Sequence, residues 1–203
     1  KRISPELNKM LAVYEYDEAG ALTVKYTYYY ETGLLESVTR TEADEFGNLY
    51  YHYADVTGKL DRQVMAEEDE VGAIAYYFEY HEGTDVISKR VGYSAADYSN
   101  PKDPVLSGQV FSEEYDESGN LINGYTYYVP SGNLESQIIS GGDIYGNEYY
   151  LYYDDATNPL KVKVLTVAEA DGTKAIFTER DETTWTRTKE TGYTACDYAD
   201  PKN

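Results

Sequence analysis

Residues 115–136 read YDESGNLINGYTYYVPSGNLES, and residues 16–37 read YDEAGALTVKYTYYYETGLLES, 99 positions earlier. Each stretch contains an acidic turn, a tyrosine-rich alternating segment, a second turn with glycine and a return segment. Turn residues between alternating apolar and polar residues are typical of a β-hairpin. The recurrence of the whole phrase indicates a repeat protein built from tyrosine-rich hairpins.

The repeat divides the chain into two copies of about 100 residues, at 1–102 and 103–203. Each copy ends in a similar sequence, GYSAADYSNPK at residues 92–102 and GYTACDYADPK at residues 192–202. Within each copy, acidic turns with glycine recur at intervals of 25 to 27 residues, beginning at Asp17 and Asp116. A period of about 26 residues accommodates two strands and two turns.

Alternation with a period of two, as in LTVKYTYYY at residues 22–30, predicts strands with one buried face. No segment has a helical period. The expected fold is all-β, with each copy an antiparallel meander that either closes into a barrel-like or sandwich-like unit or extends as one sheet. Asn123-Gly124 resembles a hairpin turn, but its register matches the middle of a strand in the first copy. The strands expected in the first copy lie near 9–16, 21–30, 34–41, 48–54, 59–66, 73–81 and 86–93.

The composition of the chain is aromatic and strongly acidic, with 25 Tyr residues and a formal net charge of -20. This charge opposes binding to nucleic acid or to an anionic membrane surface. No apolar stretch approaches the roughly 20 residues of a membrane-spanning helix, so membrane insertion is not expected. No signal peptide is present either, and we expect a targeting segment to be absent from this chain.

The acidic turns have a structural interpretation, because Asp accepts hydrogen bonds from nearby backbone amides and Gly tolerates positive φ. The alternative interpretation is calcium binding, which needs six to eight oxygen ligands and therefore several turns acting together. No other cofactor is expected. The residues that would supply carboxylates to calcium are Asp17, Asp44, Asp69, Asp116, Asp143 and Asp171.

The tyrosine runs place rings on both faces of their strands. Rings on the inner face would form the core, whereas rings on the outer face would form a ladder flanked by Asp and Glu. Such a ladder suits stacking against sugars or contact with another protein. The candidate ligand-binding residues are Tyr28, Tyr51, Tyr53, Tyr127, Tyr150 and Tyr152.

Catalysis is not expected from the sequence. His52 and His81 are the only histidines, and the second copy has Leu151 and Asp181 at those positions. Common catalytic and nucleotide-binding motifs are absent. A glycosidase-like hydrolase using two carboxylates is the third alternative for function.

YEYDEAGAL at residues 14–22 and EYDESGNL at 114–121 resemble the YD repeats of bacterial wall-associated and RHS-type proteins. The YYVPSGNLES phrase at 127–136 is similar to the variant MORN repeat of bacterial surface proteins. Both resemblances imply strings of β-hairpins in secreted or cell-surface proteins, with binding or encapsulation roles.

The leading functional hypothesis is therefore a non-enzymatic module for adhesion or assembly, located at a cell surface or secreted. Its partner would be a protein or a polysaccharide, with self-association as a further possibility. Carbohydrate binding through an exposed tyrosine ladder is the alternative.

Overall fold

The computed structural model describes residues 10–100 and 103–195, and these residues form a β-sheet of fourteen strands. The strands follow one another across the sheet in sequence order, and the pairs are antiparallel. The all-β prediction is confirmed. Within the described residues, β1 and β14 stand at the two ends of the strand order and are not paired with each other, so the sheet is open and does not close into a barrel.

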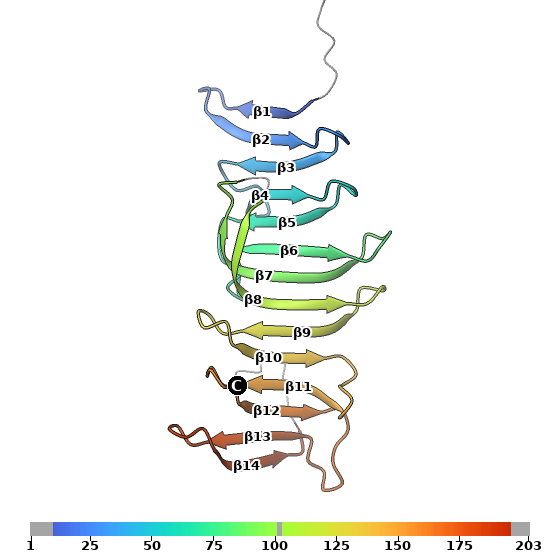
Figure 1. Cartoon of the computed structure of the whole chain (residues 1–203), viewed down its shortest axis with the longest axis vertical. Coiled ribbons are helices and arrows are strands. Elements are labelled where there is room, and N and C mark those ends of the chain that lie inside the picture. Colours follow the sequence, from blue (N-terminus) through green and yellow to red (C-terminus); the bar gives the residue numbers. More distant parts are fainter. Residues whose placement is uncertain (1–9, 101–102, 196–203) are drawn as a thin grey trace, which may run out of the picture. The chain divides into compact units, whose positions relative to one another are not determined.

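The strands of the first copy lie where the alternation predicts them, with ends that differ by a few residues (Figure 1). Asn123-Gly124 lies within a strand of the second copy, as its register predicts. The strands are β1 (Ala12–Tyr16), β2 (Leu22–Tyr28), β3 (Leu35–Arg40), β4 (Asn48–Tyr53), β5 (Leu60–Met65), β6 (Ala75–Tyr80), β7 (Ile87–Asp97), β8 (Val105–Tyr115), β9 (Leu121–Tyr127), β10 (Leu134–Ile139), β11 (Asn147–Tyr152), β12 (Leu160–Leu165), β13 (Ala175–Arg180) and β14 (Arg187–Tyr193).

The chain divides into two compact units. The first combines Lys1–Asp85 with Val91–Ser107, and the second combines Val86–Arg90 with Gly108–Asn203. The expected boundary between residues 102 and 103 lies beside residues 101–102, which are outside the described residues, and it stays a prediction. No described helix is long and apolar enough to cross a membrane.

The acidic turns form because one aspartate oxygen accepts two backbone amides. In the turn at Asp44, the amides of Phe46 and Asn48 both donate to Asp44 Oδ1 at 3.0 Å, and Gly47 has a φ of 83°. This geometry confirms the structural interpretation of the turns. The same pair of amide contacts is made by Asp17, Asp69, Asp116 and Asp143.

One face of the first unit is covered by its own chain. Tyr50, Val64 and Ala75 are buried on β4, β5 and β6. The end of β7 and the start of β8 turn back across these strands (Figure 1). Tyr98 stacks on Tyr50 with ring centroids 5.8 Å apart, and Leu106 packs on the same cluster. We call this face the covered face, and residues 93–98 with Leu106 the covering segment.

The second unit has an equivalent hydrophobic core. Its buried residues are Tyr149 and Leu151 on β11, Val164 on β12 and Ala175 on β13. Tyr149, Val164 and Ala175 repeat the core of the first unit, while Leu151 takes the position of His52. The corresponding end of the second copy, residues 196–203, lies outside the described residues.

A tyrosine face as candidate binding surface

Three tyrosines of the first unit lie in one line across the strands. In the strand register, Tyr26 on β2 is opposite Val38, and Val38 is opposite Tyr51 on β4. Tyr51 is in turn opposite Gln63, and Gln63 is opposite Tyr76 on β6. Directly paired residues point to the same face of a sheet. A ring therefore occurs on every second strand, at intervals of about 10 Å, or two strand spacings.

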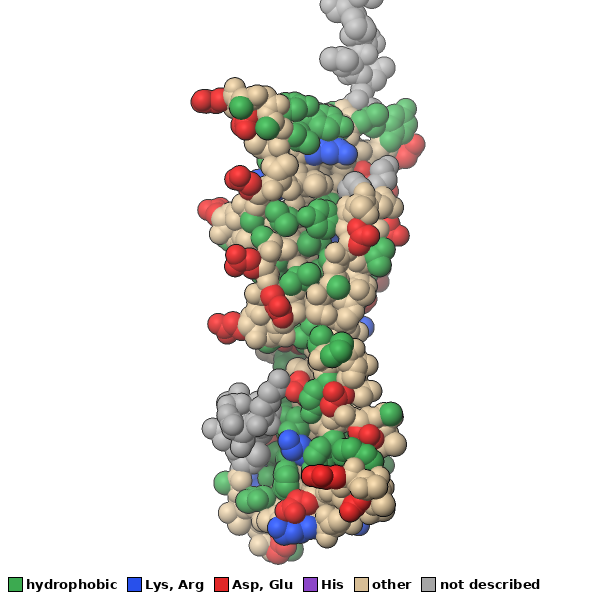
Figure 2. Space-filling view, turned by 90° about the vertical axis from the view of Figure 1, so that its left-hand side faces the viewer, with side chains coloured by type: hydrophobic (Ala, Val, Ile, Leu, Met, Phe, Trp, Pro, Cys, Tyr) green, Lys and Arg blue, Asp and Glu red, His purple; other side chains and the backbone are tan. Residues whose placement is uncertain are grey.

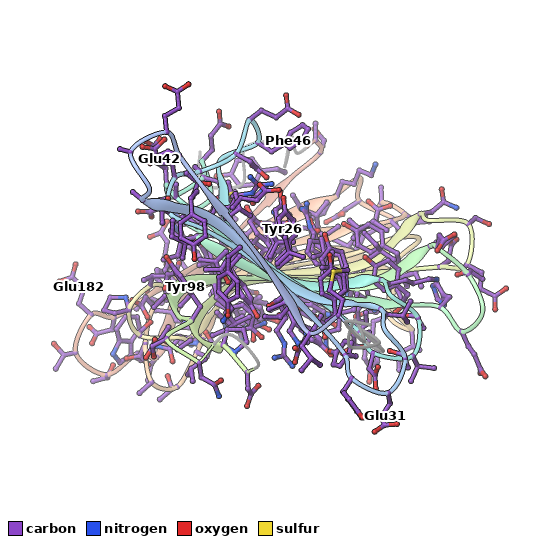
Figure 3. All side chains as sticks on the ribbon, turned by 90° about the horizontal axis from the view of Figure 1, so that it is seen from above. Tyr26, Glu31, Glu42, Phe46, Tyr98 and Glu182 are labelled. Atoms are coloured by element: carbon purple, nitrogen blue, oxygen red, sulfur yellow. The ribbon has the colours of Figure 1, made fainter. Side chains whose placement is uncertain are left out.

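This line lies on the face opposite the covered face, because Tyr51 alternates with the buried Tyr50 and His52 along β4. Figure 3 places Tyr26 and Tyr98 on opposite sides of the strands. We call the surface carrying Tyr26, Tyr51 and Tyr76 the tyrosine face.

The second unit repeats this arrangement with one difference. Tyr125 on β9 is opposite Gln137, and Gln137 is opposite Tyr150 on β11. The line continues through Lys163 to Ile176 on β13. The second unit therefore has two rings in this line, and Ile176 occupies the position of the third.

All six predicted ligand-binding tyrosines lie on the face that carries the line of rings in their own unit. A second ring stands two residues after each ring of the line. Tyr76 and Phe78 have centroids 6.2 Å apart at 23°, and Tyr150 and Tyr152 have centroids 6.2 Å apart at 19°. The six predicted residues are half-buried: Tyr28, Tyr51, Tyr53, Tyr127, Tyr150 and Tyr152.

The rings of the line differ in exposure. Tyr26 and Tyr51 are half-buried, whereas Tyr76 is only 8% exposed. On β6, the half-buried Phe78 stacks on Tyr76 and is the more accessible ring of the pair. The accessible aromatic surface at the third position is therefore a pair of rings in which Tyr76 supports Phe78.

Turn aspartates hold three of these rings in place. The hydroxyl of Tyr51 donates to Asp44 Oδ2 at 2.7 Å, and that of Tyr150 donates to Asp143 Oδ2 at 2.5 Å. Tyr76 makes the equivalent hydrogen bond to Asp69. Each tyrosine follows its aspartate by seven residues. This spacing is present in the sequence, and it is the signal that identifies Tyr76, which was not among the predicted residues.

These hydrogen bonds shift the pKa values of both partners. Burial, followed by the hydrogen bond to Asp143, raises the pKa of Tyr150 to about 12. The hydrogen bonds from Tyr150 and from the backbone of Asn147 hold the pKa of the Asp143 carboxyl below its usual value. The aspartate is thus kept ionised as an acceptor and the phenol neutral as a donor.

The turn aspartates already accept several hydrogen bonds within the protein. Asp44, Asp69 and Asp143 each use one carboxylate oxygen for two amides and the other for a tyrosine. Within residues 10–100 and 103–195, no three His, Cys, Asp or Glu side chains gather in a way that could hold a metal ion. Calcium binding at Asp17, Asp44, Asp69, Asp116, Asp143 and Asp171 stays a prediction.

His52 is a buried polar residue of the covered face. Its Nδ1 lies 2.7 Å from Asp61 Oδ1, and its Nε2 lies 3.3 Å from the hydroxyl of Tyr29. The hydroxyl of Tyr29 donates to the carbonyl of Tyr53 at 2.8 Å. Both ring nitrogens of the buried imidazole therefore have polar partners within the first unit.

Acidic side chains lie mainly at the ends of the strands. Figure 3 shows Glu31 and Glu42 in turns that project from opposite ends of the strands of the first unit. Figure 2, which looks onto one set of strand ends, shows red acidic side chains spread over this side, with hydrophobic side chains between them. The rings of the tyrosine face are therefore bordered by negative charge.

No protein-family model matches the chain, and no curated protein matches it. Among solved structures, it is similar to a mutant of S. aureus TarM in complex with Fondaparinux, alpha-GlcNAc-glycerol and UDP. That alignment has 8% identity and a TM-score of 0.23, and covers 63% of this chain and 19% of that one.

TcdB2-TccC3-TEV aligns with 12% identity and a TM-score of 0.25, over 90% of this chain and 11% of that chain. A protein of unknown function from Bacteroides fragilis aligns with 12% identity and a TM-score of 0.11, over 90% and 91% of the two chains. This chain spans about a tenth to a fifth of the first two matches. At these TM-scores, the alignments assign no family.

Proposed function

We propose that the chain is a non-enzymatic repeat module that binds a partner at a cell surface or outside the cell, in adhesion or assembly. The observation that carries this proposal is the line of rings at Tyr26, Tyr51 and Tyr76. Its rings are regularly spaced and, at two positions, hydrogen-bonded to a turn. Such a surface is already ordered before it meets a ligand.

Tyrosine suits this role because its ring supplies a large contact area and has only two side-chain torsions to order. Holding the ring in advance reduces the entropy lost on binding. The hydrogen bond between Tyr51 and Asp44 therefore serves the binding surface as well as the turn.

Carbohydrate binding is the second candidate, and the half-buried aromatic side chains of Tyr150 and Tyr152, side by side on one face of β11, favour it. Sugars contact aromatic rings through their C–H groups, so partly exposed aromatic side chains on a sheet face are suitable contacts. The described residues provide no observation in favour of a hydrolase.

The proposal is tested by retention of the purified chain on cell-wall and extracellular-matrix preparations that keep their proteins and polysaccharides. We expect the wild type to be retained and the double variant Tyr51→Ser Tyr53→Ser to be lost. Tyr145→Ser is the matched control, because Tyr145 is 79% exposed in a turn outside the tyrosine face. Circular dichroism checks that each variant is folded. Equal retention of wild type and double variant would overturn the proposal. It would also be overturned if the chain is not retained and its molecular mass in solution does not change with protein concentration, because then it binds neither a partner nor itself.

A further inference from the structure

We propose that the tyrosine face of the first unit binds an extended, uncharged β-1,4-linked polysaccharide that runs across the strands. Tyr26, Tyr51 and the stacked pair of Tyr76 and Phe78 would contact every second sugar ring. This inference rests on the proposed function and names the ligand class for the same surface.

The interval between the rings matches the repeat of an extended β-linked polysaccharide. Two strand spacings place successive tyrosines of the line about 10 Å apart, close to the length of two sugars in an extended β-linked chain. In a β-1,4-linked chain, each sugar is turned over relative to its neighbour. Every second sugar therefore presents the same face in the same direction. An α-1,4-linked glucan coils, and its sugars would not stay in step with a straight line of rings.

The residues between the rings are compatible with such a chain. Val38, between Tyr26 and Tyr51, is buried and apolar. Gln63, between Tyr51 and Tyr76, donates its amide nitrogen to Asn48 Oδ1 at 2.9 Å. Its side-chain carbonyl has the capacity to accept a hydrogen bond from a sugar hydroxyl.

The charge of the chain opposes binding of anionic polysaccharides. Its formal net charge is -20, and acidic turns project from both ends of the strands of the first unit. An anionic ligand lying across these strands would pass between the acidic turns, whose carboxylates repel it, most strongly at low salt. An uncharged chain experiences no such repulsion.

The second unit provides an internal comparison. It has rings at Tyr125 and Tyr150 but Ile176 at the third position, and Glu169 replaces the turn aspartate that would hold a third ring. We therefore expect the first unit to bind more tightly than the second. The substitution Ile176→Tyr should strengthen binding by the second unit.

The test is isothermal titration calorimetry of the full chain with three soluble probes: cellohexaose, chitohexaose and maltohexaose. We expect binding to at least one of the two β-linked probes and none to maltohexaose. Tyr51→Ala should weaken binding about tenfold or more, as expected when a central aromatic contact is removed. Tyr51→Phe keeps the ring but loses the hydrogen bond to Asp44, and it should bind more weakly than the wild type and more tightly than Tyr51→Ala. Tyr145→Ala is the control for loss of an exposed tyrosine.

Three outcomes would overturn the inference: equal binding to maltohexaose, unchanged affinity of a folded Tyr51→Ala variant, or no binding to either β-linked probe. If the β-linked probes fail while the wild type is retained on cell-wall preparations and the Tyr51→Ser Tyr53→Ser variant is not, the ligand class is wrong and the proposed function stands. If the β-linked probes fail and the wild type and the double variant are retained equally, both the ligand class and the proposed function are wrong.

Discussion

Several tyrosines in both units resist ionisation. Burial, followed by the hydrogen bond to Asp44, raises the pKa of Tyr51 to about 12. Burial likewise raises the pKa of Tyr29 and Tyr115 to about 12. In the unfolded chain, these phenols would ionise near pH 10. Their neutral form thus contributes stability that is fully present below about pH 10 and is lost as the pH rises toward 12.

We therefore predict that alkaline ionisation and unfolding are linked. Absorbance at 295 nm, followed from pH 8 to 13, should show a group of tyrosines that ionises together with loss of the circular dichroism signal, at about pH 11 to 12. Ionisation of all tyrosines near pH 10, with the dichroism unchanged, would contradict the prediction.

The contact between Tyr51 and Asp44 can be measured by itself. We predict a coupling energy of about 0.5–1 kcal/mol in a double-mutant cycle of Tyr51→Phe and Asp44→Asn, because the hydrogen bond is charge-assisted but solvent-screened. Urea unfolding of the four proteins gives the energy. Tyr26→Phe is the matched control, since Tyr26 has no aspartate seven residues earlier and should lose little stability. A coupling near zero would show that the turn does not hold the ring.

Strands and turns could be predicted from the sequence because both are encoded locally. The alternation along residues 22–30 and the Asp and Gly of each turn fix β2 and its neighbours to within a few residues. The predicted end of β7 was wrong, since the strand continues to Asp97 and not to residue 93. Its last residues belong to the covering segment, which packs on β4, β5 and β6, and no local pattern encodes a contact between distant strands.

The candidate site was predictable only in part, because its tyrosines are encoded locally but their alignment across the sheet is not. The six tyrosines were identified from their strands, but the alignment of Tyr26, Tyr51 and Tyr76 depends on the register of five strands. A shift of one residue in any pair would move a ring to the other face. Register follows from pairing, which the alternation of a single strand does not specify.

The covering segment should stabilise the first unit. We predict that Tyr98→Ala lowers the free energy of unfolding by about 2–3 kcal/mol, because it removes a ring that stacks on the fully buried Tyr50. Guanidinium unfolding measures the change. Tyr145→Ala, in an exposed turn, should change stability little. Equal effects of the two substitutions would contradict a role for Tyr98 in the core.

The charge of the whole molecule predicts its response to salt. A formal net charge of -20 produces self-repulsion, so we predict that sodium chloride raises the melting temperature as it shortens the screening length from about 30 Å at 0.01 M to 10 Å at 0.1 M. Calcium chloride at equal ionic strength should add little, because the described residues gather no metal-binding cluster. Thermal unfolding followed by circular dichroism compares the two salts. A marked calcium-specific rise, reversed by chelator, would contradict the second part and support the calcium prediction.

The seven-residue spacing between Asp44 and Tyr51 keeps a turn and its ring within one stretch of chain. A duplication or deletion of one repeat therefore adds or removes the turn, its acceptor and its ring together, in register with the neighbouring strands. The length of polymer contacted by the tyrosine face would change by one disaccharide for each repeat. A change in the number of repeats would then alter both the affinity and the length of polymer bound, without a new substitution on the binding surface.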